Sequence, residues 1–313
     1  MNSLSPNKTR LLVTPDREGE RLDVFLAGAT NLSRRAARRF VDDGRVERNG
    51  EVLRVQSRLV TAGDVIDIDR PESELGVCSD PPLASSKTLF EDPWILVAAK
   101  PAGILSQPSE GQKPGDPHAF DQQMLLALAR REGRRPFLRL VHRLDRMTSG
   151  AVLFARSPDA LPKLSRAWSE GLVERLYLAV IEGHPEADTL TIDRPIARDH
   201  GHRWRFQSQG RGKASRTEVE VLATLDDRLS VVSCRLVTGR THQVRVHLAT
   251  AGHPVLGDRL YDSKRANLVE RPLLHAAVLA LPHPATGERL RVFCPPPLDI
   301  AKFLPDDFDL STL

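Results

Sequence analysis

A run of polar residues from His142 to Gly150 connects two apolar segments and contains a candidate catalytic residue, Asp145. Loops that a rigid scaffold holds in place are favoured positions for reactive groups. An ionised carboxylate there can attack a carbon atom or accept a proton. The same residue types also form turns in their own right, so the run taken alone favours a structural turn.

Two later segments add polar side chains at the edges of predicted apolar elements. Tyr177 shares one face of a predicted strand with Arg175, where an aromatic at the rim of the core is the alternative explanation. The segment Leu236 to His247 passes from a strand into a helix and places Arg240 at the helix entrance. Arg245, further along, is either solvated or directed at a phosphate. None of these side chains specifies a reaction by itself.

The signatures of common cofactor-binding and hydrolytic sites are missing from the sequence. Gly210 to Ser215 lacks the third glycine of the dinucleotide fingerprint, and its Gly-Lys pair lacks the Ser or Thr of a phosphate-binding loop. There is no Gly-x-Ser-x-Gly elbow and no His-Glu-x-x-His helix. His242 and His247 have the wrong helical spacing to share a metal. These motifs therefore indicate no nucleotide cofactor, and the histidines indicate no shared metal site.

The size and charge of the chain suit a two-domain protein with a polyanionic partner. It has 313 residues, a formal net charge of +4 and a pI near 9.1. No run of about 18 apolar residues is present, and Met1 to Arg10 lacks the apolar stretch of a signal peptide. Cys78, Cys234 and Cys294 are too widely spaced for a disulfide framework or paired zinc ligands. These features predict a cytoplasmic protein without membrane contact.

Breaks in the sequence divide the chain into four parts. Residues 1–15 are polar and predict a flexible tail, and residues 71–87, rich in Pro, Ser and acidic side chains, predict a linker. Between them, residues 16–70 predict a small domain of two helices and a hairpin, whose second helix runs from Arg34 to Asp43. Residues 88–313 form the larger predicted domain.

The second helix of the small domain, capped by Ser33, has a basic face. At about 100° per residue, four arginines fall within an arc of about 140°: Arg34, Arg35, Arg38 and Arg39. A solvated face that binds nothing is the alternative explanation. The order of five short strings resembles the small RNA-binding domain first known from a ribosomal small-subunit protein: Arg21-Leu22-Asp23, Ser33-Arg34-Arg35, Gly44-Arg45-Val46, Asn49-Gly50 and Gly63-Asp64.

The larger domain alternates β-rich runs with helical patterns and shows no internal repeat. Strands are predicted at Trp94 to Ala98, Leu138 to Val141, Ala151 to Ala155, Leu176 to Ile181, Thr217 to Leu222 and Leu229 to Leu236. Helices are predicted at Ala119 to Arg131, Pro158 to Ser169 and Thr241 to Ala251. The mixture predicts an α+β domain built on a large mixed or antiparallel sheet, preceded by the small α+β RNA-binding domain.

A series of polar strings runs through the larger domain: Lys100-Pro101-Ala102-Gly103, His142 to Gly150, Tyr177, Lys213-Ala214 with Thr217, Thr238 to His247, Gly252, Leu256-Gly257-Asp258, Tyr261 and Leu274-His275-Ala276. In residue type and order, this series resembles the RluA family of RNA pseudouridine synthases. Met147, Arg175 and Asp262 depart from the family pattern, but none of them removes a catalytic side chain. The small RNA-binding domain is also a common N-terminal companion in this family.

The resemblance implies a cofactor-free isomerase that converts uridine in RNA to pseudouridine. Asp145 corresponds to the essential aspartate, which acts on the ribose or on the uracil ring. Tyr177 corresponds to a tyrosine that packs near the base and helps to remove the proton from carbon 5. Arg240 corresponds to an arginine that pairs with the aspartate and keeps it charged and oriented. Arg143 resembles the residue that fills the space left by a flipped base, with phosphate binding as the alternative.

The RNA target is a choice between alternatives. Family members that carry the small domain commonly act on large-subunit ribosomal RNA, so we expect this RNA as the substrate of a monomeric enzyme. The same chemistry on transfer RNA is one alternative. A noncatalytic RNA-binding or ribosome-assembly protein is another, although the presence of Asp145, Tyr177 and Arg240 argues against it. The expected RNA contacts are Arg143, Arg245 and the helix arginines Arg34, Arg35, Arg38 and Arg39.

Overall fold

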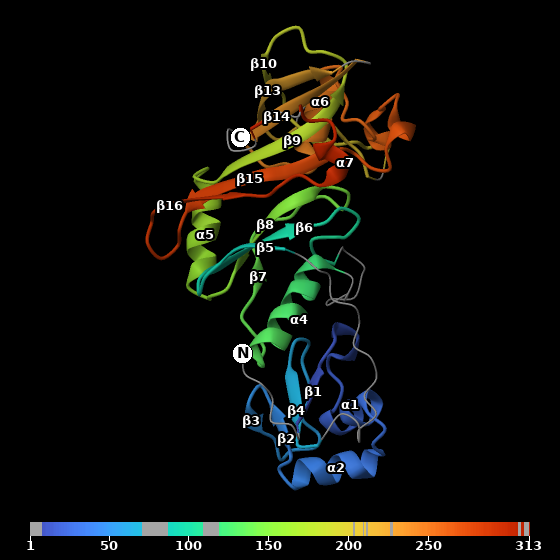
Figure 1. Cartoon of the computed structure of the whole chain (residues 1–313), viewed down its shortest axis with the longest axis vertical. Helices are drawn as coiled ribbons and strands as arrows, with labels where there is room; N and C mark the ends of the chain where they lie inside the picture. Colours follow the sequence, from blue (N-terminus) through green and yellow to red (C-terminus); the bar gives the residue numbers. More distant parts are fainter. Residues whose placement is uncertain are drawn as a thin grey trace. The chain divides into compact units, whose positions relative to one another are not determined.

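The computed structural model describes residues 8–70, 87–108, 119–202, 204–208, 210, 212–225, 228–305, 308–309 and 313 (Figure 1). Contacts divide the chain into two compact units. The first comprises Met1–Ser85 and Leu105–Leu138, and the second comprises Ser86–Ile104 and Arg139–Leu313. None of the helices in the described part of the chain combines the length and the apolar character needed to cross a membrane.

In its described residues, the first unit packs helices against a four-stranded antiparallel sheet, which contains the predicted hairpin. The strand order is β1 (Thr9–Leu12), β4 (Val65–Ile68), β2 (Val46–Arg48) and β3 (Glu51–Val52). A short 3-10 helix, η1 (Pro15–Arg17), precedes α1 (Leu22–Ala29) and α2 (Arg34–Asp42). Ser33 caps α2 by accepting a hydrogen bond from the Ala36 amide at 3.2 Å. Phe25, Val41 and Ile66 belong to one buried core that both helices and the sheet share.

The prediction of a flexible N-terminal tail is wrong for the residues of β1, which form a strand. Residues Thr9 to Leu12 pair in antiparallel register with β4, and Leu11 and Leu12 are buried. This segment orders because its apolar side chains complete the sheet edge and join the core. The predicted linker lies almost entirely outside the described residues.

A helix expected in the larger domain packs with the first unit instead. This helix, α4 (Phe120–Glu132), places Leu126 and Ala129 in a buried cluster with Leu12 and Val65 of the sheet. Its contacts therefore group it with the small unit, although the sequence boundaries put it in the larger domain. Periodicity located the helix correctly but carries no information about its packing partner.

In the described residues, the second unit is built on a ten-stranded, mostly antiparallel sheet with helices against it, which makes the protein α+β as predicted. The main strand order is β10 (Thr189–Asp193), β13 (Arg216–Leu225), β14 (Leu229–Leu236), β9 (Glu174–Glu182), β15 (Leu274–Pro282), β8 (Ser149–Ala155), β6 (Ile95–Lys100) and β5 (Thr88–Glu91). β16 (Arg289–Phe293) pairs with β15, and β7 (Arg139–Leu140) pairs with β8.

Shorter elements complete the second unit. They are α5 (Ala160–Ser169), α6 (Gln243–Thr250), α7 (Leu298–Ala301), the strand pair β11 (Ala197–Arg198) and β12 (Phe206–Gln207), and the 3-10 helices η3 (Arg259–Tyr261) and η4 (Ala266–Leu268). All six strands and the three helices predicted within residues 88–313 occur, with ends shifted by a few residues, although one of these helices, α4, belongs to the first unit. The sequence prediction missed the central strand β15, whose nearly continuous apolar run lacks the alternation of a half-buried strand.

The parallel pairing of β8 with β15 positions the polar loop that contains Asp145 (Figure 1). Gly150 lies opposite Ala276 in this pairing and adopts a φ of +130°. A Cβ atom at position 150 would lie 2.4 Å from the Ala276 carbonyl oxygen. Only glycine permits this approach, so the end of the loop is fixed against the centre of the sheet.

Candidate active site

Asp145 lies in the loop between β7 and β8, with 27% of its side chain exposed. Its backbone carbonyl accepts a hydrogen bond from the Thr148 amide at 3.1 Å, which closes a turn. Two side chains from the region of α6 face its carboxylate. Arg245 Nη1 lies 3.3 Å from Asp145 Oδ2, and His242 Nε2 lies 3.8 Å from the same oxygen. The loop and α6 thus bring a carboxylate and a cation together.

Arg245 is a buried cation held by two carboxylates. Its Nε and Nη2 atoms bind the two oxygens of Asp258 at 2.6 and 2.9 Å, and the Asp258 side chain is 1% exposed. Burial acts to lower the pKa of Arg245, but the hydrogen bonds and charge of Asp258, together with the charge of Asp145, raise it. Such a bidentate pair fixes the plane of the guanidinium. Arg245 therefore presents a permanent, oriented positive charge to Asp145.

Arg240 does not make the ion pair with Asp145 that the sequence suggested. Its Nε donates to the Ala214 carbonyl at 3.3 Å, and its side chain is exposed. Among the described residues, the arginine within ion-pair distance of Asp145 is Arg245. The reason is local geometry, because Arg240 precedes α6 whereas Arg245 sits in its first turn on the inner face. Arg240 still lines the same small pocket as Asp145.

This pocket has a volume of about 70 Å³ and is lined by Arg143, Leu144, Asp145, Thr148, Tyr177, Leu236, Arg240, His242, Gln243, Val244, Arg245 and Leu274. Ligand sites usually measure about 300–1,000 Å³. A uracil base therefore enters only after part of the lining moves. The exposed arginines Arg143 and Arg240 border the pocket and are free to move with the least loss of packing.

Tyr177 contributes the aromatic wall of the pocket from β9. Its side chain is 9% exposed, and burial raises its pKa to about 12. The phenol is therefore protonated at neutral pH. It is suited to packing against a base and to donating a hydrogen bond, whereas it must first lose its own proton before it can remove one from carbon 5.

Lys100 supports the loop that contains Asp145 from below the sheet edge. Its Nζ donates to the carbonyls of Pro101 and Ile104, both at 2.9 Å, and to that of Arg146 at 3.3 Å. The side chain is 1% exposed. Burial lowers the pKa of Lys100 to about 7, although the charge of Asp145 opposes this change. Lys100, the first residue of the Lys-Pro-Ala-Gly string, thus holds the backbone of Arg146, which follows Asp145.

Arg271 is a second support for the same loop. Its Nη1 donates to the Met147 carbonyl at 3.1 Å and to the Leu274 carbonyl at 3.2 Å. Its Nε and Nη2 bind both oxygens of Asp299 at 2.6 and 2.9 Å. Ser149 is held in addition by His275 Nδ1 at 2.9 Å. The loop is therefore fixed at three positions after Asp145, namely Arg146, Met147 and Ser149.

The sequence reasoning missed the roles of two residues near Asp145. Asp258 and Tyr261 occur in strings that carried the family resemblance, but no spacing rule links them to residue 245. The Tyr261 hydroxyl lies 2.8 Å from His242 Nδ1 and accepts a hydrogen bond from the Phe206 amide at 3.1 Å. Burial raises the pKa of Tyr261 to about 12. His242 thus lies between the Tyr261 hydroxyl and the Asp145 carboxylate.

Asp23 forms ion pairs with some of the arginines on the basic face of α2. Arg34 Nε and Arg38 Nε bind Asp23 Oδ2 at 3.0 and 2.8 Å, and Arg21 binds Oδ1 at 3.0 Å. Burial of Asp23 opposes its ionisation, but hydrogen bonds from Arg21, Arg38 and Arg34 outweigh this effect and hold its pKa well below the usual range. Two of the four arginines of the predicted face are therefore bound to Asp23.

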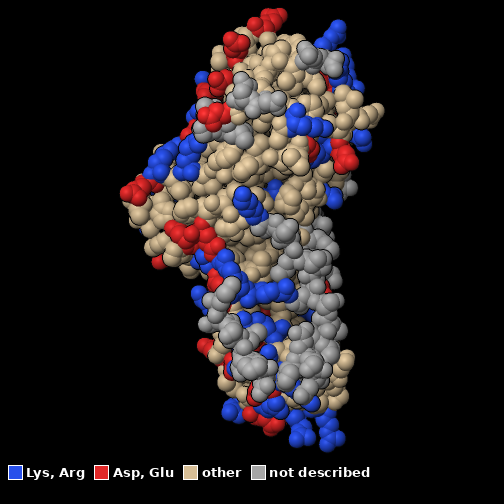
Figure 2. Space-filling model, viewed as in Figure 1, with Lys and Arg blue, Asp and Glu red and all other residues tan. Residues whose placement is uncertain are grey.

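Arg35 and Arg39 are the remaining arginines of this face, and the structure gives them no ion pair within the described part of the chain. Figure 2 shows Lys and Arg side chains gathered on the surface over α2. Both arginines are thus available for phosphate contacts, whereas Arg34 and Arg38 also hold the domain together.

Comparisons with known proteins agree with this arrangement. Residues 95–250 match a family described as RNA pseudouridylate synthase, and residues 20–66 match the S4 domain. An uncharacterized RNA pseudouridine synthase of Mycobacterium bovis is 35% identical over 303 residues, which cover 93% of this chain and 96% of that protein. The ribosomal large subunit pseudouridine synthase D of Zymomonas mobilis is 32% identical over 302 residues, covering 90% and 92%.

A solved structure extends the likeness to three dimensions. The human RNA pseudouridylate synthase domain containing 1 superimposes with a TM-score of 0.58 and 28% identity, covering 70% of this chain and 87% of the human chain.

Proposed function

We propose a substrate and a set of catalytic roles for this chain, which belongs to the RNA pseudouridine synthase family and is therefore an RNA-modifying isomerase with an S4 RNA-binding domain. The proposed substrate is one or more uridines of large-subunit ribosomal RNA. The observation that carries the proposed roles is the Asp145 carboxylate facing the buried cation Arg245 in a pocket walled by Tyr177.

Asp145 is the reacting carboxylate in this proposal. The reaction breaks the bond between ribose C1′ and uracil N1, turns the ring, and joins C1′ to C5, whose proton is lost to solvent while N1 gains one. Nothing is added or removed overall. Arg245 orients Asp145 and places a positive charge beside its carboxylate, which suits either attack on the ribose or attack on the ring. Tyr177 packs against the base, and Arg143 fills the space that the flipped base leaves.

Two observations support ribosomal RNA as the target. The Zymomonas mobilis relative is named for the large ribosomal subunit and covers almost the whole chain. The S4 domain places a second RNA-binding element at residues 20–66, which suits a large, folded RNA. The same chemistry on transfer RNA would use the same active site, so the target must be determined by experiment.

The decisive experiment is position-resolved pseudouridine mapping of total RNA from a strain without this gene and from its parent. We expect one or more positions in large-subunit ribosomal RNA to lose pseudouridine in the deletion strain. Complementation with the wild-type gene should restore them, whereas complementation with Asp145→Ala should not. Loss confined to transfer RNA would overturn the proposed target, and no loss in any RNA would overturn the proposed activity.

A further inference from the structure

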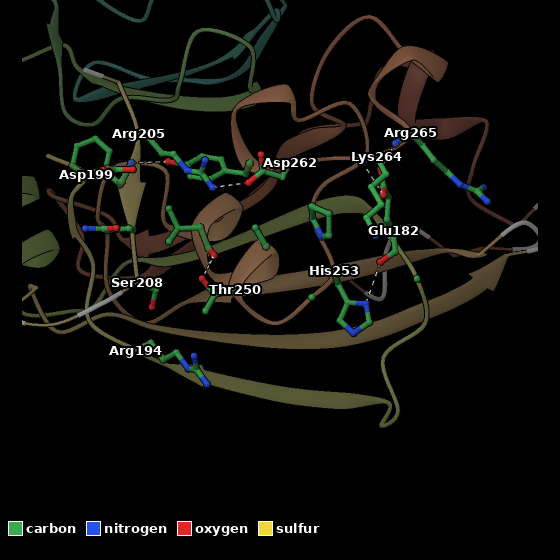
Figure 3. Close-up of a pocket in the computed structure, with 18 of the residues that line it drawn as sticks. Glu182, Arg194, Asp199, Arg205, Ser208, Thr250, His253, Asp262, Lys264 and Arg265 are labelled. Carbon is green, nitrogen blue, oxygen red and sulfur yellow. Dashed lines mark hydrogen bonds and ion pairs between the residues drawn. The ribbon is translucent and has the colours of Figure 1, made fainter. Parts of the chain in front are cut away.

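A cavity of about 970 Å³ lies in the second unit, with Tyr261 in its lining (Figure 3). It is lined by the end of β9, the β11–β12 region, the C-terminal end of α6 and the segment that follows η3. Its volume is at the upper end of the range of about 300–1,000 Å³ for ligand sites. None of the roles assigned to Asp145, Tyr177 or Arg245 uses this space.

The charged side chains that line the cavity include more cations than anions. Its lining includes five Lys and Arg residues, Arg194, Arg205, Arg228, Lys264 and Arg265, against three carboxylates, Glu182, Asp199 and Asp262. Two of these carboxylates are already engaged by the protein. Asp262 binds Arg205 at 2.6 Å, and Glu182 accepts from the Ser263 hydroxyl at 2.6 Å and the Arg265 amide at 2.8 Å.

Three of the cations in the lining face solvent. Arg194, Arg228 and Lys264 are exposed, and the structure shows no ion pair for them among the residues it describes. Figure 3 shows Arg194 with Ser208 on one side of the cavity and Lys264 with His253 on the other. Cations on two sides of one cavity suit a ligand with more than one phosphate, such as a stretch of nucleic acid.

Two further features suit nucleotides in particular. The Ser208 hydroxyl is buried and has no hydrogen-bond partner within the described residues, so a ligand oxygen would satisfy it. Phe206 is half-buried and adds aromatic surface to a lining that also carries the two histidines His184 and His253, whereas the Tyr261 side chain is buried. Unpaired RNA bases stack on such side chains, whereas a protein partner has no comparable need for dispersed phosphate-binding cations.

The cavity and the active site share a wall. Tyr261 lines the cavity and lies 2.8 Å from His242 Nδ1, and His242 Nε2 lies 3.8 Å from the Asp145 carboxylate. Tyr261 therefore links the cavity lining to the active site, and the two places are close enough for one RNA to contact both.

We infer that this cavity binds an unpaired segment of the substrate RNA that lies outside the target uridine, with phosphates on Arg194, Arg228 and Lys264. The inference rests on an RNA substrate long enough to reach both places. The cavity thus contributes to affinity and to the choice of RNA, while the chemistry takes place at Asp145.

The test compares two triple variants with equal loss of charge. The first is Arg194→Ala, Arg228→Asn, Lys264→Ala, where Asn is chosen because Arg228 has a φ of +64° that asparagine tolerates. The control is Arg166→Ala, Arg291→Ala, Lys302→Ala, which removes three exposed cations that do not line the cavity. Steady-state kinetics are measured on the RNA identified by mapping and on its shortest active fragment.

We expect the first variant to raise KM for the long RNA about tenfold without changing kcat, and to reduce the slope of log affinity against log salt by about 2. The control variant should change KM and the salt slope by less than half as much as the first variant does. On the shortest fragment, both variants should behave like the wild type. Equal effects of the two triple variants, or a KM change that persists on the shortest fragment, would overturn the inference.

A second measurement separates an RNA segment from a free nucleotide. Wild-type protein is titrated with UMP and with a single-stranded oligonucleotide of about six residues carrying 4-thiouridine, and the photo-crosslinked peptides are sequenced. We expect the oligonucleotide to crosslink to peptides around Phe206 or Tyr261 and to bind far more tightly than UMP. Binding of UMP as tight as that of the oligonucleotide would identify a free-nucleotide site instead. Should mapping identify a transfer RNA, the proposed target fails, but the same variants test the cavity on that RNA.

Discussion

Arg245 lies 3.3 Å from the Asp145 carboxylate, although the two residues are 100 positions apart in the sequence. The same guanidinium is anchored through its other nitrogens by the buried Asp258. Asp145 thus receives its positive partner from a side chain that cannot easily turn away. This pre-organisation fixes a positive charge beside the carboxylate in a partly closed pocket.

Replacing Asp145 with Asn should abolish pseudouridine formation while leaving RNA binding nearly unchanged. The amide has the same shape but lacks the charge that either attack or proton transfer requires. Activity is measured by a tritium-release assay on uridine labelled at C5, and affinity by filter binding. Activity within tenfold of the wild type would show that Asp145 is not the reacting group.

Arg245→Lys should be far more harmful than Arg240→Ala. The lysine cannot reproduce the bidentate contact with Asp258, so the variant should lose roughly 2 kcal/mol of folding stability and at least tenfold in kcat. The exposed Arg240 should leave stability within about 0.5 kcal/mol. Urea unfolding and single-turnover rates check both expectations. A larger kcat loss in Arg240→Ala would mean that Arg240 takes over the pairing when RNA is bound.

Tyr177→Phe should lower kcat but leave the shape of the pH–rate profile intact between pH 6 and 10. Because burial raises the pKa of Tyr177 to about 12, its phenol stays protonated throughout this range. Its ionisation therefore cannot produce a step in the wild-type profile. A step near pH 9 that disappears in Tyr177→Phe would show that the phenolate forms readily and serves as a base.

The arginines of α2 should separate into two groups. Arg35→Ala with Arg39→Ala should weaken RNA binding and reduce its salt slope by about 1 to 2, with an unchanged urea midpoint. Arg34→Ala with Arg38→Ala should lower the urea midpoint, because the buried Asp23 loses two of its hydrogen-bonded cations. Equal urea midpoints for the two double variants would contradict this division.

Lys100 should make folding stability depend on pH above neutrality. Its pKa is about 7 in the folded protein, against roughly 10.4 for an ordinary lysine. Between these values the unfolded chain binds more protons, so this lysine makes the folded state more stable as pH rises, by roughly 1 kcal/mol per pH unit. Lys100→Met lacks this contribution. Between pH 7 and pH 9, the free energy of unfolding measured with urea should rise more for the wild type than for the variant. An equal difference between the two proteins at both pH values would contradict this expectation.

The sequence alone determined much of the local structure. Apolar alternation located six strands of the second unit, and Ser33 with the following helical pattern located α2, because these signals depend on neighbouring residues only. Asp145 and Tyr177 were proposed as site residues from the family resemblance of the polar strings, and both line one pocket. By contrast, the central strand β15 is apolar on both faces and shows no period, so it was missed.

Only the tertiary structure decided which of these residues meet. Arg240 and Arg245 are both conspicuous in one segment, but the packing of α6 turns Arg245 toward Asp145 and Asp258 and leaves Arg240 at the surface. Likewise, Asp23 binds two arginines that the helical projection assigned to RNA. Such pairings join residues from 11 to 100 positions apart, and no local pattern encodes them. They follow from how the sheets and helices pack, which also creates the cavity beside His242 and Tyr261.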